Sequence, residues 1–390
     1  MIKSNHIMKR LHLLTLAFAG LLLQACEKNY DNVDLGDGSS KVKYAIDWNA
    51  AADSSSSWLI NNFYNAGSAY FNNTNTSDIT FNYWPQAHAL DVLVDAYTRS
   101  DSSYYLTYIQ QWHDGVKAQN GGSFLNNFYD DMEWNALAVL RAYNATNDAR
   151  YKTAVDQIWA DVKNGWNETM GGGIAWRKSQ TYYKNTPANM PACILAARLY
   201  RQFHNNDDLD WAKKIYNWEK SKLYNATNGQ VYDGINGDND GKTNTTWVFT
   251  YNQGTFIGAA LELYNATQEA GYLNDAVQAA DFVLNSQLTT ADRLLADEGT
   301  GDGGLFKGVL VRYMTQLILN SATPDDHRQQ YIALLKNNAE TLWYTGANKQ
   351  AGLYGSYWKT PAGSQSDLTT ELSGCMMVEA AALLQKNKLL

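Results

Sequence analysis

The chain has 390 residues, a formal net charge of −8 and no cluster of Lys or Arg, which excludes nucleic acid as an expected partner. Its three cysteines have no spacing typical of a zinc site. Aromatic residues make up 13% of the chain, including 13 Trp and 26 Tyr, so the rings must serve a large core, a ring-stacking surface, or both.

The N-terminal segment has the form of a bacterial lipoprotein signal. Basic residues precede an apolar run over residues 11–23, and the chain then reaches Cys26. We therefore predict a signal peptide over residues 1–25 and a lipidated Cys26 that anchors the protein in the outer membrane, on the cell surface or the periplasmic side. A transmembrane anchor is the alternative, but the apolar run is shorter than the roughly 20 residues needed to span a bilayer. Residues 26–44, rich in Asp, Asn, Gly and Ser, are predicted to form a flexible tether.

Residues 45–390 are predicted to form a single all-α domain. Helical periodicity recurs in twelve stretches, and the period-two alternation of strands is almost absent. Cys193 and Cys375 lie in apolar helical segments, so we expect buried free thiols, with a single bridge as the alternative. The twelve stretches are 47–64, 86–99, 103–118, 131–145, 149–163, 188–203, 209–223, 253–266, 271–286, 305–319, 326–344 and 367–385.

The connections between these helices are of two kinds. After every even-numbered helix the chain turns back within a few polar residues, whereas the loops after odd-numbered helices are generally long, as in 165–177 and 225–252. Because antiparallel neighbours alternate in direction, the long loops must all leave from one face, which is typical of a binding surface. A weak repeat of one helical hairpin per roughly 55 to 65 residues gives six hairpins. Six hairpins favour closure into an (α/α)6 toroid, and an open solenoid of helix pairs is the alternative.

Two adjacent carboxylates, Asp130 and Asp131, stand where the second long loop enters a helix. Cleavage of a sugar acetal needs one acid and one nucleophile or base, and two carboxyl groups supply both. Acids at a helix N-terminus are also favoured by the helix dipole and by capping, so a purely structural role is the alternative. The mixture of amides and aromatics over residues 126–134 favours the chemical role.

Other loops on the same predicted face carry residues of the types that bind sugars. Amides and hydroxyls match the dense hydroxyl pattern of a sugar, and aromatic rings cover its C–H face. The predicted substrate-binding residues are Trp84, Gln86, Tyr129, Trp134, Asn135, Trp176, Asn185, Asn189, Tyr251, Asn252, Gln253, Arg312 and Tyr354.

Five motifs occur along the domain: Phe128-Tyr-Asp-Asp-Met, Gly171-Gly-Gly-Ile-Ala-Trp, Lys184-Asn-Thr-Pro-Ala-Asn, Tyr251-Asn-Gln-Gly-Thr-Phe-Ile-Gly-Ala and Lys307-Gly-Val-Leu-Val-Arg. Together they resemble glycoside hydrolase family 76, the bacterial endo-α-1,6-mannanases, over about residues 46–384. The resemblance implies an (α/α)6 fold and retaining hydrolysis of α-1,6-linked mannan through a covalent mannosyl-enzyme intermediate. It also implies that Asp130 is the nucleophile and Asp131 the acid/base. No cofactor or metal is predicted, and we expect a monomer.

One residue near the pair departs from the family pattern. Glu133 stands where the family often has Gly, and a carboxylate this close can alter the pKa of the pair or a neighbouring subsite. The pair itself is expected to titrate jointly, because the charge on Asp130 disfavours ionisation of Asp131 and keeps it protonated. Once Asp130 has formed the glycosyl ester its charge is gone, so Asp131 becomes a better acid and can act as the base toward water.

Two weaker motifs favour structural interpretations. Residues 238–241 resemble part of a calcium loop, but Trp247 takes the position of the expected bidentate Glu, so a loop of Asx turns is favoured. His88 faces a candidate binding loop, although a structural His is favoured there.

Two further functions stay open at this point. The first is a non-catalytic, glycan-binding lipoprotein of helical repeats. The second is an α-mannan transglycosidase that uses the same covalent intermediate.

Overall fold

A computed structural model describes residues 45–390, of which Asp47–Leu390 form one compact unit. The predicted signal peptide, the lipidated Cys26 and the whole predicted tether, residues 26–44, lie outside the described residues and stay predictions. None of the helices in the described part is long and apolar enough to cross a membrane.

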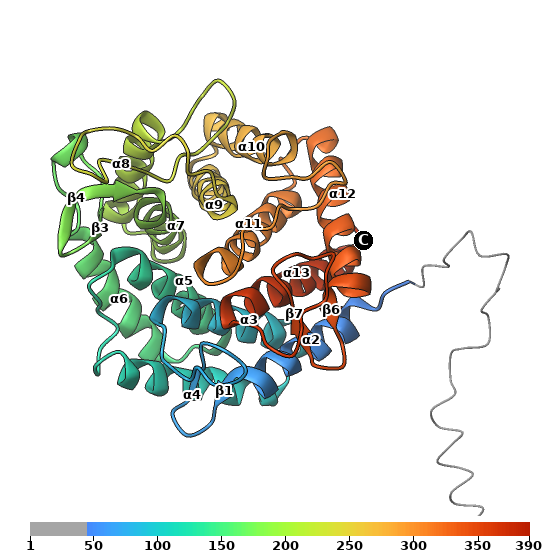
Figure 1. The fold of residues 1–390 in the computed structure, drawn as a ribbon. Helices are drawn as coiled ribbons and strands as arrows, with labels where there is room; N and C mark the ends of the chain where they lie inside the picture. The colour runs from blue at the N-terminus through green and yellow to red at the C-terminus, as the bar shows by residue number, and fades with distance from the viewer. Residues whose placement is uncertain (1–44) are drawn as a thin grey trace, which may run out of the picture. The chain divides into compact units, whose positions relative to one another are not determined.

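Twelve α-helices of the described residues form two concentric layers (Figure 1). The inner helices are α3 (Tyr83–Ser100), α5 (Tyr129–Thr146), α7 (Thr186–Phe203), α9 (Thr250–Thr267), α11 (Asp302–Leu319) and α13 (Leu368–Lys386). The outer helices are α2 (Trp48–Phe63), α4 (Ser103–Gln119), α6 (Ala149–Lys163), α8 (Asn206–Lys222), α10 (Ala270–Asn285) and α12 (Asp325–Thr341).

The inner helices close into a ring. Each inner helix packs against the next, and α13 packs against α3, so the helices form the predicted (α/α)6 toroid and not an open solenoid. Five inner helices are followed along the chain by the outer helix that covers them, whereas α13 is covered by α2 from the other end of the domain. The first and last helices therefore form the pair that closes the ring (Figure 1).

The short turns between inner and outer helices share one local design. The residue after α3, α5, α7 and α9 adopts a left-handed conformation, which ends the helix and satisfies a terminal carbonyl. In the first three turns the next residue then caps the outer helix with a side-chain oxygen. These capping residues are Ser102, Asp148 and Asn205. Such a two-residue turn forces the outer helix to run antiparallel to the inner one.

Seven short strands lie in the loops that lead from outer to inner helices, where the sequence showed almost no strand signal. Six of them are only two or three residues long, too short to show an alternating pattern. They pair antiparallel as β1 (Tyr64–Asn65) with β2 (Tyr70–Phe71), β3 (Ala175–Arg177) with β4 (Gln180–Asn185) and then β5 (Gly234–Ile235), and β6 (Ala347–Asn348) with β7 (Leu353–Tyr354). The remaining elements are a 3-10 turn, Thr169–Gly171, and a π turn, Leu342–Gly346.

Five inner helices, α3, α5, α7, α9 and α11, begin two or three residues before the predicted start. Their first turns mix polar and aromatic residues, several of them buried, so those residues lack the apolar period on which the prediction depended. As a result Asp130 and Asp131 belong to the first turn of α5. The expectation for Cys193 and Cys375 is confirmed, since both are free and buried.

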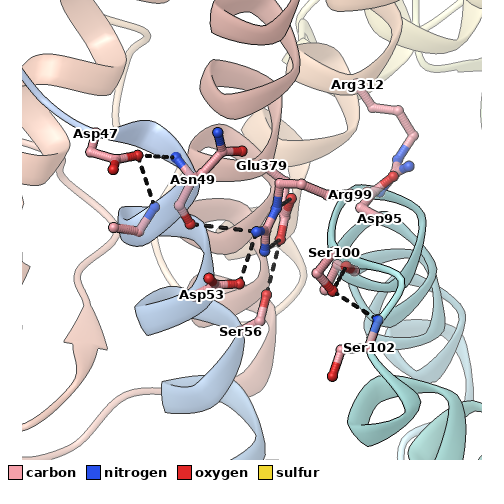
Figure 2. A network of polar contacts seen from close by, with 12 residues as sticks. Asp47, Asn49, Asp53, Ser56, Asp95, Arg99, Ser100, Ser102, Arg312 and Glu379 are labelled. Carbon is pink, nitrogen blue, oxygen red and sulfur yellow. Dashed lines mark hydrogen bonds and ion pairs between the residues drawn. The ribbon is translucent and has the colours of Figure 1, made fainter.

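A buried ion pair holds the closing helices together (Figure 2). Arg99, at the end of α3, donates from Nε to Glu379 of α13 at 2.9 Å and from Nη1 to Asp53 of α2 at 2.8 Å. Ser56 of α2 donates to the same Glu379 carboxylate at 3.0 Å. The side chains of Arg99 and Glu379 are 9% and 5% exposed, so solvent screens their attraction only weakly.

We expect Arg99→Met to destabilise the domain by about 3–5 kcal/mol, because it leaves the Glu379 carboxylate buried without its partner. Urea denaturation measures this loss as a lower midpoint at unchanged slope. The matched control is Lys213→Met, which removes the exposed pair with Glu269 and should cost at most about 1 kcal/mol. Equal losses in the two variants would contradict a special role for the closing contact.

Candidate active site

The N-termini of five inner helices, α3, α5, α7, α9 and α11, meet the long loops at one end of the ring and line a cavity of about 1100 Å³. Each helix N-terminus carries a partial positive charge and unpaired N–H groups, which favour negative charge nearby. The cavity wall includes the first turns of α3, α5, α7, α9 and α11 and the loop that follows β5. The sequence-based inference of a binding face formed by the long loops therefore agrees with the position of this cavity.

Asp130 and Asp131 both line this cavity. Asp130 accepts two hydrogen bonds, from the backbone N–H of Asp131 to Oδ1 and from the indole Nε1 of Trp176 to Oδ2, each at 3.0 Å. Burial raises the pKa of Asp130 to about 7, while these two donors stabilise the charged form and limit that rise.

Asp131 has a different electrostatic environment from its neighbour. Burial raises the pKa of Asp131 well above its usual value, and the nearby charges of Asp130 and Asp302 raise it further. The two carboxyl groups are close enough to titrate jointly, so the proton that remains belongs to the pair. The hydrogen bonds to Asp130 place the charge on Asp130 and the proton on Asp131.

Asp233 and Asp302 are cavity residues that the sequence analysis missed. Asp233 accepts hydrogen bonds from the hydroxyls of Tyr251 and Tyr183 at 2.9 and 3.1 Å, and Asp302 accepts one from the indole of Trp84 at 3.0 Å. Asp302 is the first residue of α11 but lies three residues before the predicted start at 305, so the predicted helix did not include it. Asp233 precedes β5 in an irregular loop, and its sequence context carries no signal of a site.

Five of the predicted substrate-binding residues lie on the cavity wall. They come from three inner helices and from β3 and β4, which bring segments more than 160 residues apart to one surface. These residues are Trp84, Trp134, Trp176, Asn185 and Tyr251.

The other five predicted amides are not on the cavity wall, because their NH2 groups donate hydrogen bonds to the scaffold. Gln86, Asn189 and Gln253 are each the fourth residue of an inner helix, and each donates to a backbone carbonyl of a neighbouring loop, at 2.8 to 3.0 Å. Asn135 donates to the Asp131 carbonyl at 2.8 Å, and Asn252 donates to Asp233 at 3.1 Å. All five are fully buried. We therefore correct the prediction that they contact substrate and assign them a structural role instead.

Three other predicted residues also lie away from the cavity wall. Tyr129 is buried below it, and Tyr354 is buried with its hydroxyl donating to Ser55 at 3.0 Å. Arg312 lies beyond the first turns of α11 and pairs with Asp91 and Asp95. Their side chains serve the core and the ion pairs of the ring, so their assignment to substrate contact is corrected as well.

The two weaker motifs have structural environments. In the loop after β5, side-chain oxygens of Asn236, Asp240 and Asn244 accept backbone N–H groups, as the predicted Asx turns require. His88 is buried between Trp84 and Trp134, and burial lowers the pKa of His88 to about 3. This ring is therefore neutral and packs beneath the cavity wall.

Comparison with known proteins agrees with the fold and with the geometry of this site. The model of glycosyl hydrolase family 76 matches residues 47–390. The chain belongs to this family.

Several family 76 relatives have been solved or curated. An inactive variant of the α-1,6-mannanase of Salegentibacter sp. HEL1_6, in complex with α-1,6-mannotetrose, is 42% identical with a TM-score of 0.84, over 87% of this chain and 100% of that chain. A protein from Listeria innocua is 37% identical with a TM-score of 0.81, over 88% and 99% of the two chains. The mannan endo-1,6-alpha-mannosidase of Candida glabrata is 36% identical over 151 residues, which are 35% of this chain and 34% of that protein. The chain thus matches about a third of that curated relative.

Glu133, the residue that the sequence analysis found to differ from the family pattern, lies fully buried one turn after Asp130. Neither of its carboxyl oxygens has a hydrogen-bond partner within 3.5 Å among the described residues. Burial, and next the charge of Asp130, raise the pKa of Glu133 well above its usual value, against a smaller opposing effect of the Ala192 backbone amide. Glu133 is therefore a neutral acid in the folded family 76 domain, and it adds no charge to the pair.

Because its pKa is raised on folding, Glu133 should weaken the fold as pH rises. The unfolded chain releases this proton above about pH 4.5 while the folded chain keeps it, so the stability of the wild type falls with pH. In Glu133→Gln this contribution is gone, and the gain in unfolding free energy over wild type should grow by about 1.4 kcal/mol per pH unit. Denaturant unfolding at pH 5, 6 and 7 measures the trend. The control Asp210→Asn changes an exposed acid and should show no such trend, and a pH-independent difference for Glu133→Gln would refute the neutral state.

Proposed function

We propose that this family 76 protein is a retaining endo-α-1,6-mannanase that hydrolyses the α-1,6-mannan backbone through a covalent mannosyl-enzyme intermediate. The observation that carries the proposal is the adjacent Asp130 and Asp131 on the wall of a large cavity, where Asp130 accepts two hydrogen bonds and burial and nearby charges raise the pKa of Asp131. The printed names of the relatives, an α-1,6-mannanase with bound mannotetrose and a mannan endo-1,6-alpha-mannosidase, support the choice of substrate.

In the first step, a carboxylate oxygen of Asp130 attacks the anomeric carbon of the mannosyl residue at the scissile bond. Asp131 gives its proton to the glycosidic oxygen, so the bond to the leaving chain breaks as the bond to Asp130 forms. Asp131 has become an anion, and Asp130 is now a neutral ester. Before and after this step only one of the two carboxyl groups is charged. The exchange therefore avoids the repulsion that two ionised groups would have.

In the second step, Asp131 takes a proton from water, and the water oxygen attacks the same anomeric carbon. Asp130 leaves as a carboxylate, stabilised by the N–H of Asp131 and the indole of Trp176. Two inversions return the original anomeric configuration, and both carboxyl groups regain their starting protonation. The same two hydrogen bonds thus stabilise the nucleophile before attack and after release.

Action in the middle of a chain requires a cavity that holds mannosyl residues on both sides of the scissile bond. The cavity wall extends from Trp84 and Asp302 to Trp247 in the loop after β5, which leaves room beyond the Asp pair for several sugar units. The wall combines rings with amides, hydroxyls and carboxylates, which suits a neutral polymer rich in hydroxyl groups.

The decisive experiment incubates the protein with linear α-1,6-mannan and sizes the products over time. We expect early release of a range of oligosaccharides, with the α-anomer appearing first in the NMR spectrum. Asp130→Asn and Asp131→Asn should each lose at least about 10³-fold in kcat, while the exposed control Asp156→Asn keeps wild-type activity. Early mannose alone would point to exo action, and the β-anomer first would refute retention.

The same experiment separates the two alternative functions. A non-catalytic glycan-binding protein would bind mannan in every variant and release no product. A transglycosidase would form products longer than the starting chains at high oligomannoside concentration. Cleavage by the wild type that disappears in both Asp variants, with no longer products, would leave the hydrolase as the remaining candidate.

We also propose, from the sequence alone, that Cys26 carries a lipid that holds the enzyme at the outer membrane. Cys26→Ser should move the protein from the membrane fraction to the soluble fraction after cell lysis, while mannanase activity is retained. Protease treatment of intact cells would distinguish the cell surface from the periplasmic side. Membrane association that persists in Cys26→Ser would contradict the lipid anchor.

A further inference from the structure

We propose that Trp247 forms a distal subsite of the cavity, where its indole stacks on a mannosyl residue remote from the Asp pair and gives the enzyme a preference for longer chains. The proposal rests on the proposed mannanase function and extends it to the selection of chain length.

The exposure of Trp247 is unusual for this chain. Its side chain is 50% exposed, the highest value among the aromatic residues of the part of the chain that the structure describes. Trp247 also lines the same cavity as Asp130 and Asp131. An indole left in water loses the free energy of burial, which a flat apolar ligand face would restore.

A row of aromatic rings connects the Asp pair to Trp247. The hydroxyl of Tyr251 donates to Asp233, which lies close enough to Asp130 for its charge to raise the pKa of that nucleophile. The Tyr251 ring stacks on Phe306 at a centroid distance of 3.9 Å, and Phe249 lies 5.2 Å from Phe306. Trp247 follows at 6.4 Å from Phe249. All four rings line the cavity, so the row is a continuous apolar strip from the chemical centre to the rim.

The backbone that carries Trp247 is held in place by the loop itself. The Asn244 side-chain oxygen accepts the backbone N–H groups of Thr246 and Trp247, at 3.0 and 3.1 Å. The backbone N–H of Asn244 donates to the Gly234 carbonyl at 2.9 Å, which ties this turn to β5. The indole is thus presented from a fixed turn, so little conformational entropy is lost when a ligand stacks on it.

The groups around Trp247 suit a sugar better than an apolar partner. Asn244, Thr245 and Thr246 line the same cavity. The Thr246 hydroxyl donates to the Asn244 side-chain oxygen at 2.8 Å, so the Asn244 NH2 group and the Thr245 hydroxyl are the polar groups left for a ligand. A sugar ring presents an apolar C–H face together with hydroxyls at its edge. The indole of Trp247 matches the C–H face, and these polar groups match the hydroxyls. The occupant is therefore a mannosyl unit of the same chain whose scissile bond lies at Asp130.

The test compares kcat/KM for linear α-1,6-manno-oligosaccharides of increasing length in the wild type, Trp247→Ala and Trp247→Phe. We expect the ratio of kcat/KM for the longest to the shortest substrate to fall about three- to tenfold in Trp247→Ala, mainly through KM. Trp247→Phe should retain much of the ratio, since it keeps a ring. The control Tyr104→Ala removes an aromatic residue of α4 that is 44% exposed and outside the cavity lining, and it should leave the ratio at the wild-type value.

A second measurement separates this proposal from the proposed function. Binding of the same oligosaccharides is titrated by calorimetry in Asp130→Asn with and without Trp247→Ala. Affinity that rises with chain length only when Trp247 is present supports the distal subsite, even if the wild type hydrolyses no mannan and the proposed function fails. An equal loss at every chain length, or no loss at any length, would overturn the subsite, whatever the hydrolysis assay shows.

Discussion

The closure of the ring is the constraint on which the rest of the structure depends. When α2 packs on α13, each of the six inner helices has an inner helix on either side. Their N-termini then all lie at the same end of the ring. Arg99 holds this contact from α3 by pairing with Glu379 on one closing helix and Asp53 on the other (Figure 2). The tight left-handed turns after α3, α5, α7 and α9 turn the chain back into α4, α6, α8 and α10, so the long loops leave from the other end of the ring, where the cavity lies. The order and direction of the helices therefore determine where the candidate active site lies, independently of any particular side chain.

This arrangement sets two electrostatic effects against each other at the cavity. Converging helix N-termini favour carboxylates, while burial among neighbouring acids favours carboxylic acids. The balance depends on hydrogen bonds at each group. Asp233 has three donors and still has a raised pKa because of burial, whereas Glu133 has no hydrogen-bond partner within 3.5 Å and its pKa is raised much further. A site of this kind supplies acids and bases near neutral pH.

The sequence predicted the helices well because their apolar period reflects burial in the ring. It predicted that Asp130 and Asp131 belong to a binding face because amides and aromatics surround them over residues 126–134, which favoured a chemical role over helix capping. It failed for the amides, since Gln86 or Asn189 has the same chemistry whether it binds a sugar hydroxyl or a backbone carbonyl. Their shared place as fourth residue of an inner helix appears only in the structure, because the helices begin two or three residues before the predicted starts. Asp233 could not be predicted, because only the folded loop before β5 brings it to Tyr183 and Tyr251.

The three carboxyl groups in the first turns of α5 show how partners rather than position decide chemical roles. Asp130, Asp131 and Glu133 lie within four residues, and burial raises the pKa of each. Only Asp130 receives donors, from Trp176 and the Asp131 amide, so it is the group that can carry the charge. Asp131 keeps its proton and faces the cavity, where a glycosidic oxygen can take it. Burial raises the pKa of Glu133 in the core, so an extra acid beside the pair is compatible with the proposed two-carboxylate mechanism.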